Sequence, residues 1–562
     1  MTDFAKKPVA FDDKQSSVLK CPEEIYARGF FPPIQLPDGR VIKGDVLPSG
    51  WFNDLMSRAM QSNINELPVA AVPSSFGWNE AASGVTDWFA IHVGPISIEI
   101  GSIRETTNSS PTLVPKTPFI GNPQVYLTDI SDPTVANGKM VGWTGVGGTL
   151  PQKPLAFCSL NRAEGFVAPG TFYYILVGER AVTGQTPGGK PFCSEPQTFL
   201  DGQTSFSAPT NDQVSFGFVP PVMDTTGLRE ADTLPANVLN YLFHELTANI
   251  GSVYWEMKND GGNSGLKHYR IILGDMMIQS FGTAIPAGGN GGTDSVTISY
   301  AWPFKTNCAA AEMMAIGGVQ NTGVPSYAMA NCISYQNMQV ANRQVNVANS
   351  AKSVAGTMAF LCFGPAPDNL ARPKSKVPGI DGFAMQDKTY VDGQPNKVKP
   401  AADRMAAGFF PSRKMNGGAV EHGDFVTANE INWLFNDAYK LKANTKIATG
   451  TIAADAAKKI AGGHWITIGD LLIEWFQVSG TTAADWPSNV RQQLFAMPFR
   501  PGSSPCVWLR DTSAAETGYV MAGTIGEAFL TNEWARFTGI QINTGNQAWP
   551  GNFCVLAIGR KP

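Results

Sequence analysis

Residues 408–438, GFFPSRKMNGGAVEHGDFVTANEINWLFNDA, contain the pattern that decides the fold, because the chain carries it three times. The pattern also occurs at residues 29–59, GFFPPIQLPDGRVIKGDVLPSGWFNDLMSRA, and, one residue shorter, at residues 217–246, GFVPPVMDTTGLREADTLPANVLNYLFHEL. Internal repeats determine how a long chain divides, so they take precedence over any single motif. Each copy predicts an extended, proline-rich arm that lies across a neighbouring repeat and leads into a helix.

Further landmarks keep their spacing after each helix. A Gly opens a short apolar segment, a Pro-Phe pair follows, and an apolar strand ends in a second Gly. These landmarks are Gly94, Pro118-Phe119 and Gly178, then Gly274, Pro303-Phe304 and Gly364, then Gly469, Pro498-Phe499 and Gly559. The sequence therefore predicts three repeat units, residues 8–190, 196–370 and 387–562, each large enough to hold its own core.

Each helix has one apolar stripe at spacing i, i+3, i+4, i+7. A helix of about three to four turns is marginal alone, so the stripe must dock. It packs either on the β-domain of its own repeat or in a three-helix bundle, between three chains or among three repeats of one chain. The residues expected to pack are Phe52, Leu55, Met56, Leu239, Leu242, Phe243, Ile431, Leu434 and Phe435.

Three asparagines, Asn53, Asn240 and Asn432, occupy the same position at the edge of the stripe. A buried Asn can fix the register of a helical bundle. A solvated Asn beside the stripe is the expected arrangement, since an amide is costly to bury without partners.

Beyond each helix, polar and apolar residues alternate, as in SVTISYAW at 295–302 and at Ile96, Ile98 and Ile100. Turn residues recur about every 8–12 positions, which is typical of antiparallel sandwiches. The predicted fold is mainly β, with three tandem antiparallel β-sandwich domains, each preceded by an extended segment and a short amphipathic helix. The copies diverge at residues 129–169, 317–354 and 512–550, interpreted as loops that either bind a target or vary freely.

Composition excludes several classes of protein. Charged residues make up 16%, below the roughly 25% of an average domain, and the net charge is −4. We therefore expect self-association or binding to other proteins, and no binding to nucleic acid. No apolar stretch is long enough to insert into a membrane, and residues 1–15 lack the apolar core of a signal peptide. Eight cysteines without CxxC spacing predict free, mostly buried thiols.

No catalytic residue, cofactor or metal ligand is predicted, because the five histidines are scattered and no nucleotide-binding or nucleophile motif occurs. His268 and His464 are expected at strand edges. Glu99, Gln279 and Glu474 share one position, and one copy lacks the carboxylate. They are therefore interpreted as exposed strand residues and not as the paired carboxylates of a glycoside hydrolase.

Tryptophans are the candidates for glycan contact, since an indole can stack on the apolar face of a sugar. The candidates are Trp143, Trp302, Trp486, Trp534 and Trp549, with a core position as the alternative for each.

The second half of each repeat resembles the C-terminal tip domain of bacteriophage tail fibres. In the second repeat the resemblance runs from Tyr269 to Gly274, through Ile278-Gln279 and residues 296–304, to residues 358–364. It covers about half of the chain. The resemblance implies a virion protein, usually trimeric, whose tip loops touch the host surface, and it supplies no receptor-contacting residue.

The sequence thus favours a phage virion structural protein, a tail fibre or fibre-like appendage whose sandwiches attach to a host-surface glycan, and not an enzyme. Its expected partners are other virion proteins and copies of itself, as a homotrimer or an intrachain pseudo-trimer, with a bacterial surface receptor left open. The expected location is the virion, assembled in the host cytoplasm. The alternatives are a tail-sheath, collar, head-fibre or adaptor component without a receptor role, a capsule depolymerase, and a bacterial surface lectin.

Overall fold

The computed structural model describes part of the chain, and all structural statements concern that part. The described residues are 19–28, 30, 34–35, 40–42, 47–65, 85–105, 112–113, 115, 117, 119–121, 123–129, 139–146, 155–161, 170–180, 192, 207–220, 222–224, 227–229, 236–251, 253–259, 266–286, 296–321, 326–344, 355–370, 383–407, 409, 413–414, 420–421, 427–443, 447–487, 490–502, 505–511, 522–541, 545–547 and 551–562.

The chain forms two compact units, and their boundaries cut across the three repeats. One unit combines Met1–Leu67, Gly188–Ser252 and Lys374–Lys446, and the other combines Pro68–Pro187, Val253–Pro373 and Ile447–Pro562. Each repeat therefore contributes its arm and helix to a helical unit and its strands to a β unit. The expected division into three successive domains describes the repeats in sequence and not these compact units.

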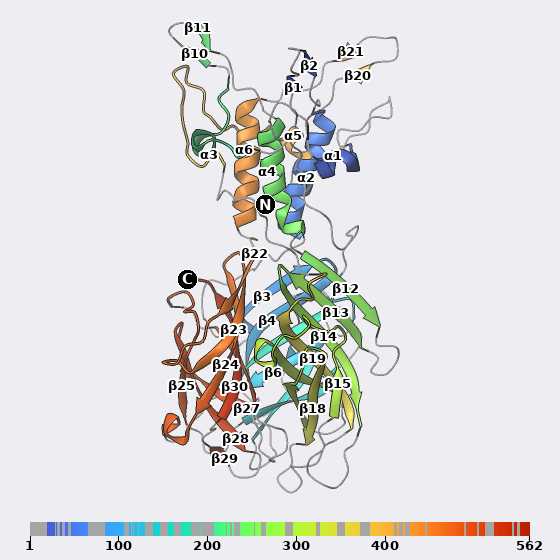
Figure 1. Cartoon of the computed structure of the whole chain (residues 1–562), viewed down its shortest axis with the longest axis vertical. Helices are drawn as coiled ribbons and strands as arrows, with labels where there is room; N and C mark the ends of the chain where they lie inside the picture. Colours follow the sequence, from blue (N-terminus) through green and yellow to red (C-terminus); the bar gives the residue numbers. More distant parts are fainter. Residues whose placement is uncertain are drawn as a thin grey trace. The chain divides into compact units, whose positions relative to one another are not determined.

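The helical unit is built around three long helices, one from each repeat: α2 (Ser49–Asn65), α4 (Ala236–Gly251) and α6 (Ala428–Ala443). They lie side by side (Figure 1), and each contacts the other two. All nine stripe residues named above are buried in one hydrophobic cluster. The helices therefore pack as a bundle within one chain, and each is about a turn longer than the pattern suggested.

Each helix is preceded in sequence by a residue that favours a helix start. Pro48 and Pro235 immediately precede α2 and α4. Thr427 precedes α6, and the backbone N–H groups of Thr427 and Glu430 each donate to the other's side chain. This reciprocal pair is a capping box, which satisfies backbone donors that the first turn leaves free.

The arms contain local structure that the sequence pattern did not reveal. Each carries a six-residue helix: α1 (Glu23–Arg28), α3 (Asn211–Phe216) and α5 (Ala402–Ala407). Each also carries a short hairpin, formed by β1 (Ile34–Gln35) with β2 (Val41–Ile42), β10 (Val222–Asp224) with β11 (Gly227–Arg229), and β20 (Arg413–Lys414) with β21 (Val420–Glu421). Elements this short give no periodic signal.

The β unit confirms the predicted mainly-β, antiparallel fold. In repeat 1 the larger sheet has the order β3 (Val85–Val93), β4 (Ile96–Glu105), β9 (Gly170–Glu179) and β6 (Gln124–Asp129), and the smaller has β5 (Thr112–Leu113), β8 (Leu155–Asn161) and β7 (Lys139–Val146). The other repeats use the same order, with one further edge strand on the larger sheet.

In repeat 2 the larger sheet runs β12 (Val253–Asn259), β13 (Lys267–Leu273), β14 (Met276–Ile285), β19 (Gly356–Pro365) and β16 (Met314–Asn321), and the smaller β15 (Val296–Ser299), β18 (Asn337–Gln344) and β17 (Ser326–Cys332). In repeat 3 they are β22 (Ile447–Ile452), β23 (Ile460–Ile468), β24 (Leu471–Thr481), β30 (Gly551–Arg560) and β26 (Cys506–Asp511), then β25 (Arg491–Leu494), β28 (Trp534–Gln541) and β27 (Ala522–Leu530), with β29 (Gly545–Gln547) on β28. Two 3-10 turns, η1 (Ala310–Glu312) and η2 (Ala483–Asp485), complete the elements.

The divergent segments are only partly loops, which corrects the expectation from sequence. Residues 129–169, 317–354 and 512–550 contain the paired strands β7–β8, β17–β18 and β27–β28 of the smaller sheets. The side chains of these strands differ among repeats while their pairing is kept, because backbone hydrogen bonds carry the register.

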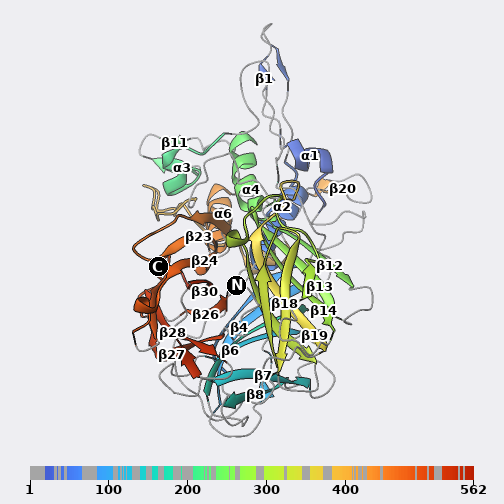
Figure 2. The ribbon, with the colours of Figure 1, turned by 60° about the horizontal axis from the view of Figure 1, so that its bottom comes forward.

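The three sandwiches close into a ring in which each repeat contacts both others (Figure 2). The Tyr126 hydroxyl of repeat 1 lies 2.8 Å from the Ser280 hydroxyl of repeat 2. The Trp475 indole N–H of repeat 3 donates to the Glu312 carbonyl of repeat 2 at 3.0 Å. The Trp508 ring of repeat 3 packs 5.8 Å from the Tyr173 ring of repeat 1. The last contact closes the ring.

No helix in the described part of the chain is long and apolar enough to cross a membrane. Six cysteines, Cys21, Cys308, Cys332, Cys362, Cys506 and Cys554, are described as free thiols, and all but Cys308 are buried. For these six, the expectation of free, mostly buried thiols is confirmed.

Candidate functional site

Three buried asparagines tie the repeats together in the helical unit. The Asn53 amide bonds both the N–H and the C=O of Phe409, Asn240 does the same to Phe30, and Asn432 to Phe218, at 2.7–3.0 Å. Each Asn side chain is 0% exposed. The expectation that these residues face solvent is therefore wrong, because a backbone segment more than 200 residues away supplies both hydrogen-bonding partners.

The asparagine contacts run in a cycle. The helix of repeat 1 holds the arm of repeat 3, the helix of repeat 2 holds the arm of repeat 1, and the helix of repeat 3 holds the arm of repeat 2. The predicted reach of each arm across a neighbour is confirmed. Each contact satisfies two buried backbone groups, and an unpaired group of this kind costs about 1–3 kcal/mol. The cycle therefore specifies one mutual arrangement of helices and arms.

A second set of three equivalent residues holds the turn before each Pro-Phe pair. Glu99 accepts from the Thr117 N–H at 2.6 Å, and Glu474 accepts from the Met497 N–H at 3.0 Å. Gln279 accepts from the Trp302 N–H at 3.1 Å and donates to the Trp302 carbonyl at 2.8 Å. All three side chains are buried. The expectation that they are exposed strand residues is therefore wrong. Each is a turn clamp, a buried side chain that holds the backbone of the turn, and Gln serves this purpose as well as Glu.

Burial sets the protonation of one clamp. Desolvation raises the pKa of Glu474 from its ordinary 4.5 to about 8, while backbone N–H donors from residues 496 and 497 partly oppose the shift. The carboxyl is thus mainly protonated at neutral pH. Gln279 meets the same need in repeat 2 without a titratable group.

The glycines that end the last strand of each repeat (Gly178, Gly364 and Gly559, the closing glycines) leave room for the Phe of each Pro-Phe pair. A Cβ built on Gly364 would lie 2.8 Å from the ring of Phe304, and one on Gly559 would lie 2.9 Å from Phe499. The Phe of each Pro-Phe pair therefore packs directly on the strand backbone, which only Gly permits at this distance.

The candidate tryptophans do not form one surface. Trp302 and Trp486 are 7% and 2% exposed, so neither presents a ring face to a ligand, and their expected role in glycan contact is corrected to core packing. Trp534 is half-buried, with the Arg536 guanidinium 5.5 Å from its ring centre. The side chains of Trp143 and Trp549 lie outside the described residues.

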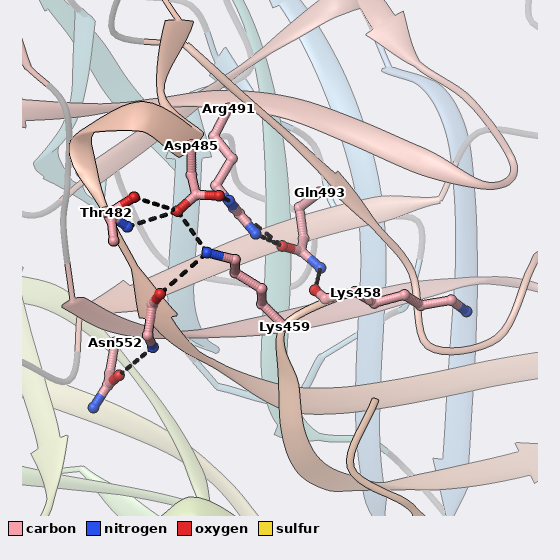
Figure 3. A network of polar contacts seen from close by, with 8 residues as sticks. Lys458, Lys459, Thr482, Asp485, Arg491, Gln493 and Asn552 are labelled. Atoms are coloured by element: carbon pink, nitrogen blue, oxygen red, sulfur yellow. Dashed lines mark hydrogen bonds and ion pairs between the residues drawn. The ribbon is translucent and has the colours of Figure 1, made fainter. Parts of the chain in front are cut away.

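Repeat 3 carries a polar network at the end of its sandwich (Figure 3). Lys459 donates to Asp485 at 2.7 Å, the Thr482 N–H donates to the same carboxylate oxygen at 2.7 Å, and Arg491 lies 3.8 Å from the other oxygen. These contacts, led by the Lys459 hydrogen bond, hold the pKa of Asp485 well below its usual range. Lys458 extends its side chain away from Asp485, as Figure 3 shows.

A pocket of about 220 Å³ lies between the β22–β23 hairpin and residues 496–497. Its lining includes Thr451, Asp455, Lys458, Trp465 and Met497. Trp465 is half-buried on β23, directly opposite Gly450 of β22. Trp465 is not among the glycan-contact candidates predicted from sequence. What distinguishes it from other tryptophans is Gly450, which lies opposite it in the hairpin and has no side chain.

Repeat 2 places charged and aromatic side chains at the corresponding positions. Glu256 pairs with Arg270 in the register that pairs Gly450 with Trp465. The Arg270 guanidinium forms an ion pair with Glu256 and lies 4.9 Å from the Trp302 ring centre, over which Lys258 also sits at 4.3 Å. The open end of this sandwich is thus packed with side chains.

The histidines do not converge. His268 contacts the Gly282 carbonyl at 3.0 Å, and His464 is buried with its ring 5.7 Å from that of Trp475. They lie six and five residues before their turn glycines, so they are not equivalent. Within the described residues no group of His, Cys, Asp and Glu side chains is arranged to hold a metal ion.

Comparisons with known proteins yield little. No protein-family model matches the chain, and no curated protein matches it. Among solved structures, an N-truncated R2-type pyocin tail fibre is similar at 14% sequence identity over 49% of this chain and 96% of that chain, with a TM-score of 0.16. A TM-score this low carries no argument about the fold or the function.

Proposed function

We propose that the chain is a structural protein of a phage virion, a tail fibre or fibre-like appendage that attaches to the host surface through its β-sandwiches. The observation that carries the proposal is the cyclic interlock of three repeats in one chain, with each arm held by the next helix. Such an interlock is what three subunits of a trimeric fibre would need. Here one chain supplies it, so the three sandwiches are free to carry different surfaces.

The role is proposed as non-enzymatic. A depolymerase of the usual kind needs two accessible carboxyl groups flanking the scissile bond. Glu99 and Glu474 are 0% exposed, and each is used to hold a backbone N–H. Their equivalence to Gln279 supports a role in shaping the turn.

The experiment is immunogold electron microscopy of particles produced from the genome that encodes the chain, combined with an adsorption assay. Antibodies against the purified chain are expected to label a projecting appendage. Pre-incubation of host cells with the purified chain is expected to reduce adsorption of the particles. Labelling without any effect on adsorption would favour a collar, sheath, head-fibre or adaptor component. Absence of the chain from particles would refute the proposal.

A further inference from the structure

The pocket of repeat 3 is lined by a tryptophan that packs on a strand position without a side chain. A Cβ built on Gly450 would lie 2.5 Å from two indole carbons of Trp465, so the indole packs directly against the backbone of β22 at a position that only Gly leaves open. Trp465 is half-buried, and part of its side chain lines the pocket. A flat aromatic ring supported from behind is a stacking platform.

The walls around the platform are fixed by hydrogen bonds within the chain. Asp455 Oδ1 accepts from the N–H groups of Ala457 and Lys458 at 3.0 and 3.1 Å, which sets the turn between β22 and β23. The Lys458 ammonium donates to the carbonyls of Phe495 and Ala496 at 3.1 and 3.2 Å, joining that turn to the opposite wall. The Glu474 clamp holds Met497 on the same wall. The pocket is therefore formed before any ligand arrives, which lowers the entropic cost of binding.

The lining combines an apolar base with a few polar groups. Ile452, Ile460 and Met497 supply apolar surface, while Thr451 and Asp455 supply a hydroxyl and a carboxylate. The volume of about 220 Å³ is smaller than the roughly 300–1,000 Å³ of sites for drug-sized ligands, so it suits one small ring. A sugar ring matches this chemistry, since it has an apolar C–H face and hydroxyl groups around its edge.

We infer that this pocket binds a single pyranose ring of a surface polysaccharide, stacked on Trp465 with its hydroxyls directed to Thr451 and Asp455. The inference rests on the attachment role proposed above and names its site. Repeat 2 fills the corresponding positions with Glu256 and Arg270, so of these two repeats the asymmetry assigns binding to repeat 3. Repeats 2 and 3 thus use the same pair of strand positions for packing and for binding, respectively.

The test uses the full chain and saturation-transfer NMR with the methyl α-glycosides of glucose, galactose, mannose, rhamnose and N-acetylglucosamine as probes. At least one probe is expected to receive saturation, mainly at the protons of one ring face. Trp465→Ala is expected to weaken that signal roughly tenfold or more, as loss of one stacking contact would. Leu494→Ala, which removes an exposed apolar side chain of the same repeat outside the pocket lining, is the control and should leave it unchanged.

A second variant protects the test against misfolding. Ala453 is exposed at the edge of the pocket, so Ala453→Trp is expected to block the pocket while leaving the thermal midpoint unchanged. Saturation of no probe by the wild-type chain would overturn the inference, as would a signal that survives Ala453→Trp. The immunogold experiment involves no sugar, so failure of the proposed virion role would be recognised separately.

Discussion

In the helical core, equivalent positions of the three repeats make the same contacts, whereas at the ends of the sandwiches they differ between repeats. In the core, Asn53, Asn240 and Asn432 make the same pair of hydrogen bonds three times. At the ends, Gly450 and Trp465 in repeat 3 stand where repeat 2 has an ion pair. Where a residue connects one repeat to the next, its type is constrained by the backbone groups of the neighbouring repeat. At the ends of the sandwiches, the residue type is constrained only by packing within its own repeat.

The largest expected effect is loss of one asparagine contact. Asn432→Ala leaves the N–H and C=O of Phe218 without their partner, which should lower the free energy of unfolding by roughly 2–5 kcal/mol. Urea denaturation followed by circular dichroism measures it. Asn429→Ala on the same helix is the control, because the Asn429 side-chain oxygen has no hydrogen-bond partner in the described structure. Equal losses for the two variants would contradict the role assigned to the cycle.

The closing glycines come next. Gly364→Ala places a methyl group 2.8 Å from the Phe304 ring and 3.0 Å from Met313, and overpacking of this kind costs about 1–3 kcal/mol. Gly121→Ala adds a methyl group with nothing within 4 Å and should be close to neutral. Thermal unfolding compares the two. A neutral Gly364→Ala would mean that the Pro-Phe turn does not pack tightly on the strand.

Exchanging Glu and Gln at two equivalent turn clamps should change the pH dependence of stability in opposite directions. Because the pKa of Glu474 is raised from 4.5 to about 8, its favourable contribution is complete below about 4.5 and is lost as the pH rises through 8. Glu474→Gln should therefore raise the melting temperature at pH 9 and change it little at pH 4. Gln279→Glu should introduce the same alkaline sensitivity into repeat 2. A pH-independent effect of both substitutions would refute this account of the clamps.

The smallest effect is expected at the partly buried polar network of repeat 3. Asp485 has a lowered pKa, so its contribution is present above its ordinary value of 3.8 and is lost as the pH falls through the lowered value. Asp485→Asn should lower the melting temperature slightly at pH 7 and not at all in strong acid, the reverse of Glu474→Gln. Salt should reduce this effect in part, since ion pairs that solvent still reaches are screened.

The sequence revealed what is periodic and missed what depends on distant partners. The triplication, the stripe through Leu55, Leu242 and Leu434, and the mainly-β fold follow from spacing alone. The burial of Asn240 could not be foreseen, since its partner Phe30 lies 210 residues away. Trp465 was not selected because its platform depends on Gly450, which only the register of a hairpin brings opposite it.

Sedimentation equilibrium of the purified full chain tests the closed arrangement of three repeats most directly. If each arm is held by a helix of its own chain, the particle should have the 60.2 kDa mass of one chain at every concentration, with all three asparagine contacts satisfied. An assembly of three chains that separates only when the protein unfolds would contradict this, because the arms would then be exchanged between chains.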